Sequence, residues 1–250
     1  MSSRTAIVTG GGKRVGEAIV RALLEDGWAV IAHVHRDADA VPDGATKAVA
    51  DLAEPDCAER IFAAVEGHPP VRLLVNNAAR FAFDALGEVS TTEFDAHMKV
   101  NARAPLLLIN ELARRHGGGD ALAVNLLDAK LASPNPDFLS YTLSKYALAG
   151  LTEVAARALA PKGIRVNAIA PALMLPSGDQ DDANFGAVHA LNPLRRGIDV
   201  SDVLAALRYL IDSTGVTGET LVLDGGQRFM ALPRDVQFLS PSPESQMEAE

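Results

Sequence analysis

The stretch Ala6-Ile-Val-Thr-Gly-Gly-Gly-Lys-Arg-Val-Gly-Glu-Ala-Ile-Val20 contains a short apolar run, a glycine-rich turn and a helical pattern that continues through Leu24. Glycines between a strand and a helix let the backbone approach a pyrophosphate, and the helix N-terminus favours its negative charge. A flexible turn is the alternative interpretation of a glycine cluster. The run Trp28-Ala-Val-Ile-Ala-His-Val34 favours the pyrophosphate interpretation, because it has the pattern of a second buried strand and completes a βαβ unit.

The residues that end this second strand bear on the choice between NAD and NADP. An acidic side chain there accepts from the ribose hydroxyls, whereas an arginine pairs with a 2′-phosphate. The sequence is His33-Val-His35-Arg36-Asp37, and a second arginine, Arg14, stands in the glycine turn. The two guanidinium groups predict NADPH, with Asp37 interpreted as a solvated loop residue.

Polar residues follow three more strand-like runs. The runs 45–50, 71–75 and 121–127 precede Asp51-Leu52, Asn76-Asn77-Ala78-Ala79 and Asp128, respectively. Ligands of doubly wound sheets sit at the carboxyl ends of the strands, although the polar residues after the first two runs could also cap loops. A helical stretch from Thr91 to Arg115 precedes the last run and carries Asn101 among apolar neighbours.

Tyr141 and Lys145 stand four residues apart in a helical pattern, so they share one helix face. Free tyrosine titrates near pH ~10, and a neighbouring ammonium stabilises the phenolate and lowers this pKa. A tyrosine so placed can donate a proton to a reacting group. A Tyr-x-x-x-Lys pair alone is more often ordinary helix surface, so its interpretation depends on the residues around it.

Composition excludes several classes of protein. The chain has 250 residues, of which 48% are hydrophobic and 22% charged, enough for one α/β domain or two smaller ones. The formal net charge of −9 disfavours nucleic acid or an anionic membrane as the main partner. A single cysteine excludes an intrachain disulfide, and no leader or long apolar run is found, so we expect a reducing, cytoplasmic location. The six histidines have no metal-like spacing, and no metal is predicted.

The remaining chain supplies further elements of the same α/β pattern. Residues 163–170 have the pattern of a buried strand, residues 171–182 that of a long loop closing a site, and Val200 to Ile211 that of a helix. No linker divides residues 1–239, which we expect to form one domain. Residues 240–250 are rich in Ser, Pro and Glu and are predicted to be a disordered tail.

The chain resembles the short-chain dehydrogenase/reductase family over about residues 4 to 228. The resemblance rests on motifs in the expected order and at the expected separations, namely Thr9-Gly10 with Gly16, Asn76-Asn77-Ala78, Asn101, and Tyr141-x-x-x-Lys145. It implies a Rossmann-like, doubly wound parallel sheet with helices on both faces, a nicotinamide cofactor, and hydride exchange with a carbonyl, alcohol or imine. It also implies a homotetramer in which the helices near 91–115 and 141–160 pair between subunits.

Departures from the general family pattern resemble the pteridine reductase branch. Arg14 replaces a glycine two residues before Gly16, Ala79 replaces the glycine after Asn-Asn-Ala, and Asp128 replaces a serine thirteen residues before Tyr141 (141 − 128 = 13). In that branch an Asp-Tyr-Lys set replaces Ser-Tyr-Lys, and a phenylalanine matching Phe81 stacks on the pterin ring. A loop-packing aromatic is the alternative interpretation of Phe81.

This resemblance implies a pterin-type small-molecule substrate and assigns residues to three roles. Lys145 would hold the nicotinamide ribose and lower the Tyr141 pKa, and Tyr141 would supply a proton. Asp128 would form a hydrogen bond with Tyr141 or with the substrate. The expected cofactor-binding residues are Gly10, Lys13, Arg14, Val15, Gly16, His35, Arg36, Asp51, Leu52, Asn77, Ala78, Lys145 and Pro171. The expected substrate-binding residues are Phe81, Asp128, Tyr141, Leu173 and Met174.

Two other functions stay open. A reductase of another carbonyl or imine would use the same fold, and a non-catalytic NADPH-binding regulator would keep the fold for sensing. Retention of Tyr141 and Lys145 argues against the regulator.

Overall fold

The computed structural model describes residues 3–176 and 182–239, and residues 240–250, expected to be a disordered tail, lie outside this range. The described chain contains a parallel sheet in the order β3-β2-β1-β4-β5-β6-β7. The strands are β1 (Thr5–Val8), β2 (Ala29–Val34), β3 (Thr46–Val49), β4 (Val71–Asn76), β5 (Ala121–Leu126), β6 (Ile164–Pro171) and β7 (Thr220–Leu223). This is the Rossmann-like, doubly wound sheet that the sequence predicted.

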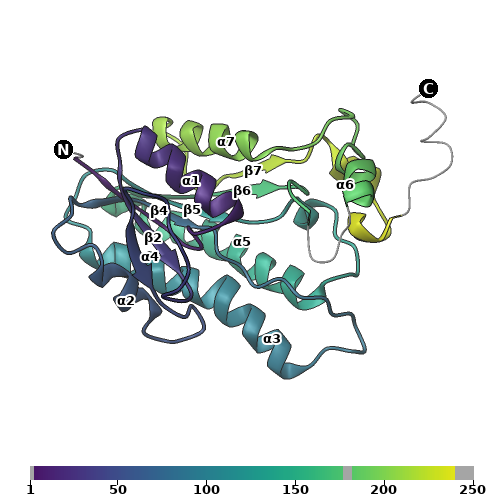
Figure 1. Ribbon diagram of the computed structural model, residues 1–250, viewed down its shortest axis with the longest axis horizontal. Helices are drawn as coiled ribbons and strands as arrows, with labels where there is room; N and C mark the ends of the chain where they lie inside the picture. The colour runs from purple at the N-terminus through teal and green to yellow at the C-terminus, as the bar shows by residue number, and fades with distance from the viewer. Residues whose placement is uncertain (1–2, 177–181, 240–250) are drawn as a thin grey trace.

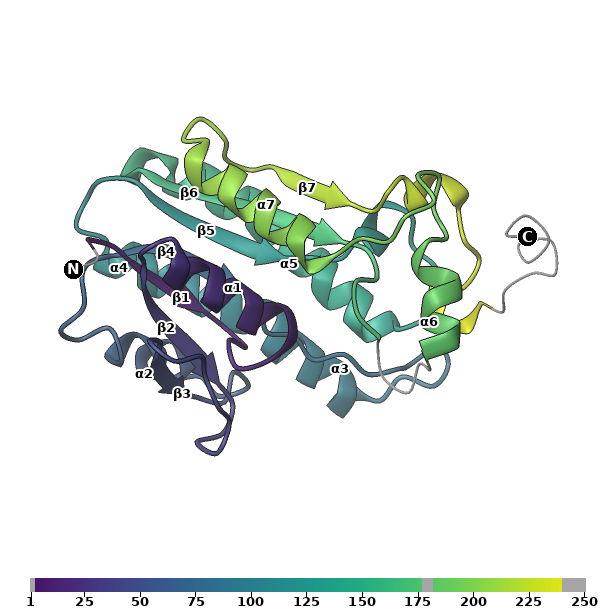
Figure 2. The same ribbon diagram turned by 45° about the horizontal axis from the view of Figure 1, so that its top comes forward.

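Helices cover both faces of the sheet. The α-helices are α1 (Arg14–Glu25), α2 (Cys57–Ala63), α3 (Thr91–Met98), α4 (Ala104–Arg115), α5 (Leu139–Leu159), α6 (Asp182–His189) and α7 (Val200–Asp212). Helices α1 and α7 lie on one face, and α2, α4 and α5 lie on the other (Figures 1 and 2). None of the helices in the described part of the chain is long and apolar enough to cross a membrane.

Each face of the sheet has its own hydrophobic core. Ile19, Leu23 and Val203 pack under α1 and α7, whereas Phe62 and Leu108 pack under α2 and α4. Every residue of β5 and β6 is buried, because helices cover both faces there. This explains why these strands are continuous apolar runs in the sequence.

The predicted helix over 91–115 is interrupted. A π-helical segment, η1 (Lys99–Arg103), separates α3 from α4 and contains the buried Asn101. Single π-turns inside helices occur often at functional sites. The π-turn was not predicted, because one extra residue barely changes the apolar periodicity.

Two further elements differ from the sequence-based expectation. The seven-residue helix α2 was not predicted, because it is too short to show a helical period. Of the loop predicted over 171–182, residues 172–176 are irregular and α6 begins at Asp182. Residues 177–181 lie outside the described residues.

The order of the strands creates a binding position. The chain moves outward from β1 to β2 and β3, and then returns to β4 on the other side of β1. Ligands of such sheets bind beyond the carboxyl ends of the strands at this switch point. The turns after β1, β4 and β5 all open toward it.

Candidate active site

The glycine turn between β1 and α1 can hold a phosphate group. Gly10 has a positive φ of +64°, and a Cβ added at Gly16 would lie 2.0 Å from the Gly10 carbonyl oxygen. Only glycine therefore fits at position 16, where the backbone of the turn meets the start of α1. A helix N-terminus approached by bare backbone suits a pyrophosphate, so the turn fits the expected dinucleotide.

The buried ring of His33 stabilises this turn through a hydrogen bond. Its Nδ1 accepts from the Gly10 N–H at 3.2 Å, and its Nε2 lies 3.0 Å from the Ala50 carbonyl oxygen. Since Nδ1 must accept, the neutral ring donates through Nε2. Burial, the largest cause, lowers the pKa of His33 below 6.5, so the ring stays neutral at neutral pH.

We therefore expect the free energy of unfolding to contain a pH-dependent term from His33. Because its folded-state pKa is lowered, this stabilisation is complete above the unfolded value of 6.5 and is lost as the pH falls from there toward the folded-state pKa. Urea unfolding of the wild type and of His33→Gln across this window measures the effect. The variant, which lacks the titrating ring, should lose less stability, and identical pH slopes would contradict the assignment.

The residues expected at the adenosine end lie after β2 and β3. Arg36 is exposed, and its backbone N–H donates to Asp39. His35 Nε2 lies 3.6 Å from the Asp51 carboxylate. The side chain of Leu52 is buried in the hydrophobic core. The carboxylate of Asp37 is solvated, as expected, with its side chain 94% exposed.

The segment after β4 is fixed by the hydroxyl of Thr9 and the side-chain amide of Asn101. The Thr9 hydroxyl accepts from the backbone N–H groups of Asn77 and Ala78, both at 3.0 Å. Asn101 accepts from the Arg80 N–H at 2.7 Å and donates to the Arg80 carbonyl and to the Ser144 hydroxyl on α5. The π-turn thus ties the segment that carries Phe81 to the helix that carries Tyr141.

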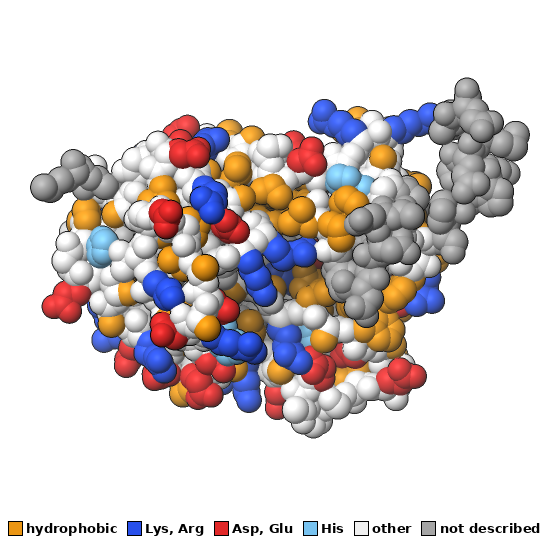
Figure 3. Space-filling view, viewed as in Figure 1, with side chains coloured by type: hydrophobic (Ala, Val, Ile, Leu, Met, Phe, Trp, Pro, Cys, Tyr) orange, Lys and Arg blue, Asp and Glu red, His pale blue; other side chains and the backbone are white. Residues whose placement is uncertain are grey.

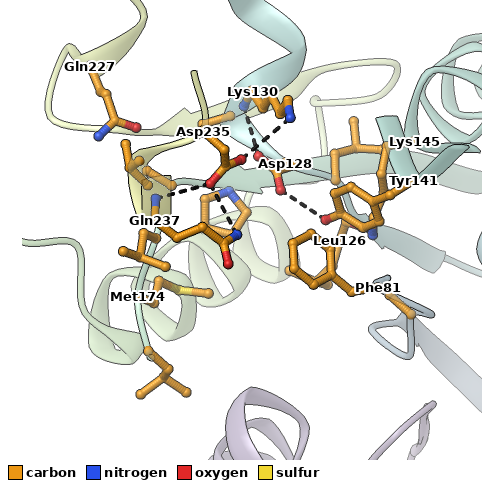
Figure 4. Close-up of a pocket in the computed structure, with 18 of the residues that line it drawn as sticks. Phe81, Leu126, Asp128, Lys130, Tyr141, Lys145, Met174, Gln227, Asp235 and Gln237 are labelled. Carbon is orange, nitrogen blue, oxygen red and sulfur yellow. Dashed lines mark hydrogen bonds and ion pairs between the residues drawn. The ribbon is translucent and has the colours of Figure 1, made fainter. Parts of the chain in front are cut away.

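Asp128, Tyr141 and Lys145 meet at the carboxyl end of β5, as the sequence predicted (Figure 4). The Tyr141 hydroxyl donates to Asp128 Oδ2 at 2.9 Å, and Asp128 Oδ1 accepts from the Lys130 N–H at 2.8 Å. Lys145 Nζ donates to the Leu126 carbonyl at 2.6 Å and lies 5.5 Å from the centre of the Tyr141 ring. The Tyr141 and Lys145 side chains are almost entirely buried.

The expected lowering of the Tyr141 pKa by Lys145 is not found in this structure. Burial, followed by the Asp128 carboxylate, raises the pKa of Tyr141 well above 10. Burial also raises the pKa of Asp128 and lowers that of Lys145 to about 8. Burial is the largest cause, and the Asp128 carboxylate adds to it because it accepts a hydrogen bond from the phenol, whereas Lys145 donates its hydrogen bond to a carbonyl. Tyr141 is therefore held protonated, as a donor.

These three residues line a cavity of about 620 Å³. Its walls also include eight other residues predicted to contact the cofactor or the substrate, namely Lys13, Arg14, Val15, Asn77, Phe81, Pro171, Leu173 and Met174. The Phe81 ring is 39% exposed, stacks on Phe138 at 4.3 Å and meets the Tyr141 ring edge-on at 4.7 Å. Phe81 thus presents an aromatic surface to the cavity beside the Tyr141 phenol.

Arg14 belongs to this cavity. Its guanidinium donates to the Pro176 carbonyl at 3.0 Å, whereas Arg36 lies outside the lining residues. The prediction that the two arginines flank one 2′-phosphate stays a prediction, since Arg14 and Arg36 make separate contacts in this structure. Arg14 also has a φ of +53°, which is strained for a residue other than glycine by about 1 kcal/mol or more.

One wall of the cavity was not predicted from the sequence. Residues of the C-terminal segment line it opposite α5, namely Leu232, Asp235, Val236 and Gln237. The loop after β5 adds Lys130, Ser133 and Asn135. No periodicity or motif marks these residues, because they lie in irregular chain and in the short turns η2 (Ala129–Ala132) and η5 (Val236–Phe238).

Basic side chains gather near the middle of the face shown in Figure 3, between apolar patches. The chain nevertheless has a net charge of −9. This local excess of cations suits an anionic ligand better than the overall charge does.

Comparison with known proteins identifies the family. The model of a family described as enoyl-(acyl carrier protein) reductase matches residues 12–228. Dehydrogenase/reductase SDR family member 4 of Homo sapiens is 32% identical over 247 residues, covering 90% of this chain and 88% of that protein. Dihydromonapterin reductase of Citrobacter koseri is 30% identical over 232 residues, covering 88% and 95%. The chain therefore belongs to the short-chain dehydrogenase/reductase family.

A solved structure extends this likeness to the pterin-related enzymes. FolM alternative dihydrofolate reductase 1 from Brucella canis, complexed with NADP, matches with a TM-score of 0.85 and 35% identity, over 91% of this chain and 95% of that chain. The resemblance to pteridine reductases predicted from Arg14, Phe81 and Asp128 agrees with this finding. The expected NADP-type cofactor agrees with it as well.

Proposed function

We propose that this protein is an NADPH-dependent reductase of a pterin-type substrate. One observation carries the proposal: the Asp128 carboxylate, 2.9 Å from the Tyr141 hydroxyl, faces a cavity beside the exposed ring of Phe81. A carboxylate can accept from the amino and N–H groups of a pterin, whereas a simple ketone offers only an acceptor. Similarity to a dihydromonapterin reductase and to FolM supports the same substrate class.

The chain's own residues define how the cofactor would be held. The glycine turn and the start of α1 would receive the pyrophosphate, Arg36 the 2′-phosphate, and Lys145 the nicotinamide ribose. Asn77, Ala78 and Pro171 would complete the walls, and His35 and Asp51 would face the adenosine end. NADPH, when bound, supplies the hydride.

The substrate would lie on Phe81, with Leu173 and Met174 on the opposite wall. Tyr141, held protonated by burial and by Asp128, would give its proton to a ring nitrogen. Asp128 would orient the phenol and accept from the substrate's donors. Lys145, with a pKa of about 8, would restore the proton of Tyr141 at neutral pH.

Steady-state NADPH oxidation with a panel of dihydropterins and a panel of aliphatic ketones and imines tests the proposal. We expect turnover with at least one dihydropterin. Turnover with ketones or imines alone would favour a reductase of another substrate. NADPH binding without any turnover would favour the regulator.

Arg36→Ala should weaken NADPH binding markedly and NADH binding little. A charge-assisted hydrogen bond contributes roughly 1.5 to 3 kcal/mol, equivalent to about a 10- to 150-fold change in affinity. Fluorescence titration of both cofactors with the wild type and the variant measures this difference. Arg21→Ala, whose guanidinium pairs with Glu17 on the surface of α1, is the matched control. Equal losses for NADPH and NADH would contradict the role of Arg36.

We also propose a homotetramer that pairs α4 and α5 between subunits. These helices expose large apolar side chains, with Leu106 49%, Leu143 43%, Tyr146 42% and Val154 65% exposed. Covering such a surface is favourable. Light scattering at micromolar concentration should give four times the chain mass, and a monomer would contradict the proposal.

A further inference from the structure

The C-terminal segment 234–238 brings a second carboxylate to the candidate active site. Asp235 lines the cavity from the side opposite Tyr141, and Figure 4 shows it facing Asp128 and Lys130, with Gln237 beside it. The roles proposed above for Asp128, Tyr141 and Phe81 do not use Asp235. Its side chain is only 16% exposed, so the charge is held at a partly buried position.

Several contacts fix this segment in place. The buried Asp137 carboxylate accepts from Arg234 Nε and from the Asp235 N–H, both at 2.8 Å. The Phe238 ring stacks on Phe138 with the ring centres 5.7 Å apart. Asp137 and Phe138 immediately precede α5, which carries Tyr141. The segment 234–238 is thus attached to the start of α5, the helix that carries the proposed proton donor Tyr141.

Asp235 keeps the capacity to accept further hydrogen bonds. Its Oδ1 accepts from the Gln237 backbone N–H at 3.3 Å and from the Gln237 side chain at 3.2 Å. Its Oδ2 lies 3.4 Å from Lys130 Nζ, a long contact, and Lys130 also donates to the Asp137 carbonyl. An ionised carboxylate offers about four lone-pair sites, so a donor on a ligand can still be received.

We infer that Asp235 is a specificity-determining residue that accepts hydrogen bonds from hydroxyl groups on the side chain of the pterin-type substrate, an inference that rests on the proposed function. The pterin ring would be bound by Phe81 and Asp128, and the substituent would extend toward Asp235. Neighbouring neutral polar residues, namely Ser133, Asn135, Gln227 and Gln237, line the same cavity and suit a hydroxylated group.

The charges near Asp235 favour a neutral substituent over an anionic one. Lys130 is paired with Asp235, and Arg228 is paired with Asp224 at 3.0 Å. A substituent that ends in carboxylates would meet the Asp235 charge, and neither Lys130 nor Arg228 could pair with it without breaking one of these ion pairs. Like charges at close range are unfavourable, so the site discriminates against it.

The test compares three substrates that share the pterin ring. They are dihydromonapterin, which carries hydroxyl groups, a methyl-substituted dihydropterin, which carries none, and dihydrofolate, which carries carboxylates. The variants are Asp235→Asn and Asp235→Ser, both of which retain an oxygen that can cap η5. Far-UV circular dichroism and NADPH affinity verify that each variant is folded.

We expect kcat/KM for the hydroxylated substrate to fall by about 10- to 150-fold in both variants, the range for one charge-assisted hydrogen bond. The value for the methyl-substituted substrate should stay within about threefold, and that for dihydrofolate should rise in Asp235→Asn. Calorimetric titration of the hydroxylated substrate into the NADP-loaded protein should show the same loss of affinity.

Equal losses for all three substrates would overturn the inference, because they would indicate a purely structural residue. Unchanged discrimination in folded variants would overturn it as well. A wild-type protein that reduces the three substrates equally contradicts only the role of Asp235. A wild-type protein that reduces none of them contradicts the proposed function, and the inference fails with it.

Discussion

Asp128→Ser is expected to lower the turnover of a dihydropterin by about 10²–10⁴-fold, the range for a lost acid/base group. The serine hydroxyl is shorter and uncharged, so it cannot hold the Tyr141 phenol as the carboxylate does at 2.9 Å, and it accepts fewer donors from the substrate. NADPH affinity should change little, because Asp128 is separate from the phosphate-binding turn. Single-turnover reduction and NADPH titration measure the two effects.

Asp128→Asn distinguishes charge from shape. The amide keeps the size of the side chain and its contact with the Lys130 N–H, but loses the charge and the capacity to relay a proton. It should be nearly as inactive as the serine variant. Neither variant should be less stable than the wild type by more than about 1 kcal/mol, since burial raises the Asp128 pKa and its charged form is disfavoured in the fold. If the serine variant reduces dihydropterins normally, Asp128 is structural and the pterin assignment loses its main support.

Tyr141→Phe is expected to lower turnover by a similar factor of about 10²–10⁴, because the phenol is the proton donor. Groups that act as a unit do not contribute additively. The double variant Asp128→Ser/Tyr141→Phe should therefore be only slightly less active than either single variant. Measured kcat values for the four proteins complete the cycle.

Tyr146→Phe is the matched control for this cycle. Tyr146 lies on the same helix, is 42% exposed, donates to the Leu131 carbonyl at 3.0 Å, and is not among the residues that line the cavity. Its loss should change kcat by less than about threefold. Additive losses in the double variant would mean that Asp128 and Tyr141 act independently, which would contradict the coupling inferred from their hydrogen bond.

The sequence by itself determined the fold and the set of candidate catalytic residues, Asp128, Tyr141 and Lys145. Strands buried on both faces must be continuous apolar runs, so β1, β4, β5 and β6 were recognisable without tertiary information. Gly16 and the Tyr141–Lys145 spacing are local features, fixed by one turn and by one helical period. The departures Arg14, Ala79 and Asp128, together with Phe81, then indicated the branch of the family.

Only the tertiary structure decided the pKa values of the candidate catalytic residues and which residues form the walls of their cavity. The pKa of Tyr141 depends on burial and on which group bonds the phenol, and neither follows from the spacing of residues along a helix. The contact between the Arg14 guanidinium and the Pro176 carbonyl joins positions 162 residues apart, so the sequence did not predict it. Asp235 reaches Lys130 across 105 positions of sequence, through irregular chain that carries no periodic signal. Contacts between such distant segments arise from packing, so the wall that we propose selects the substrate was not visible in the sequence.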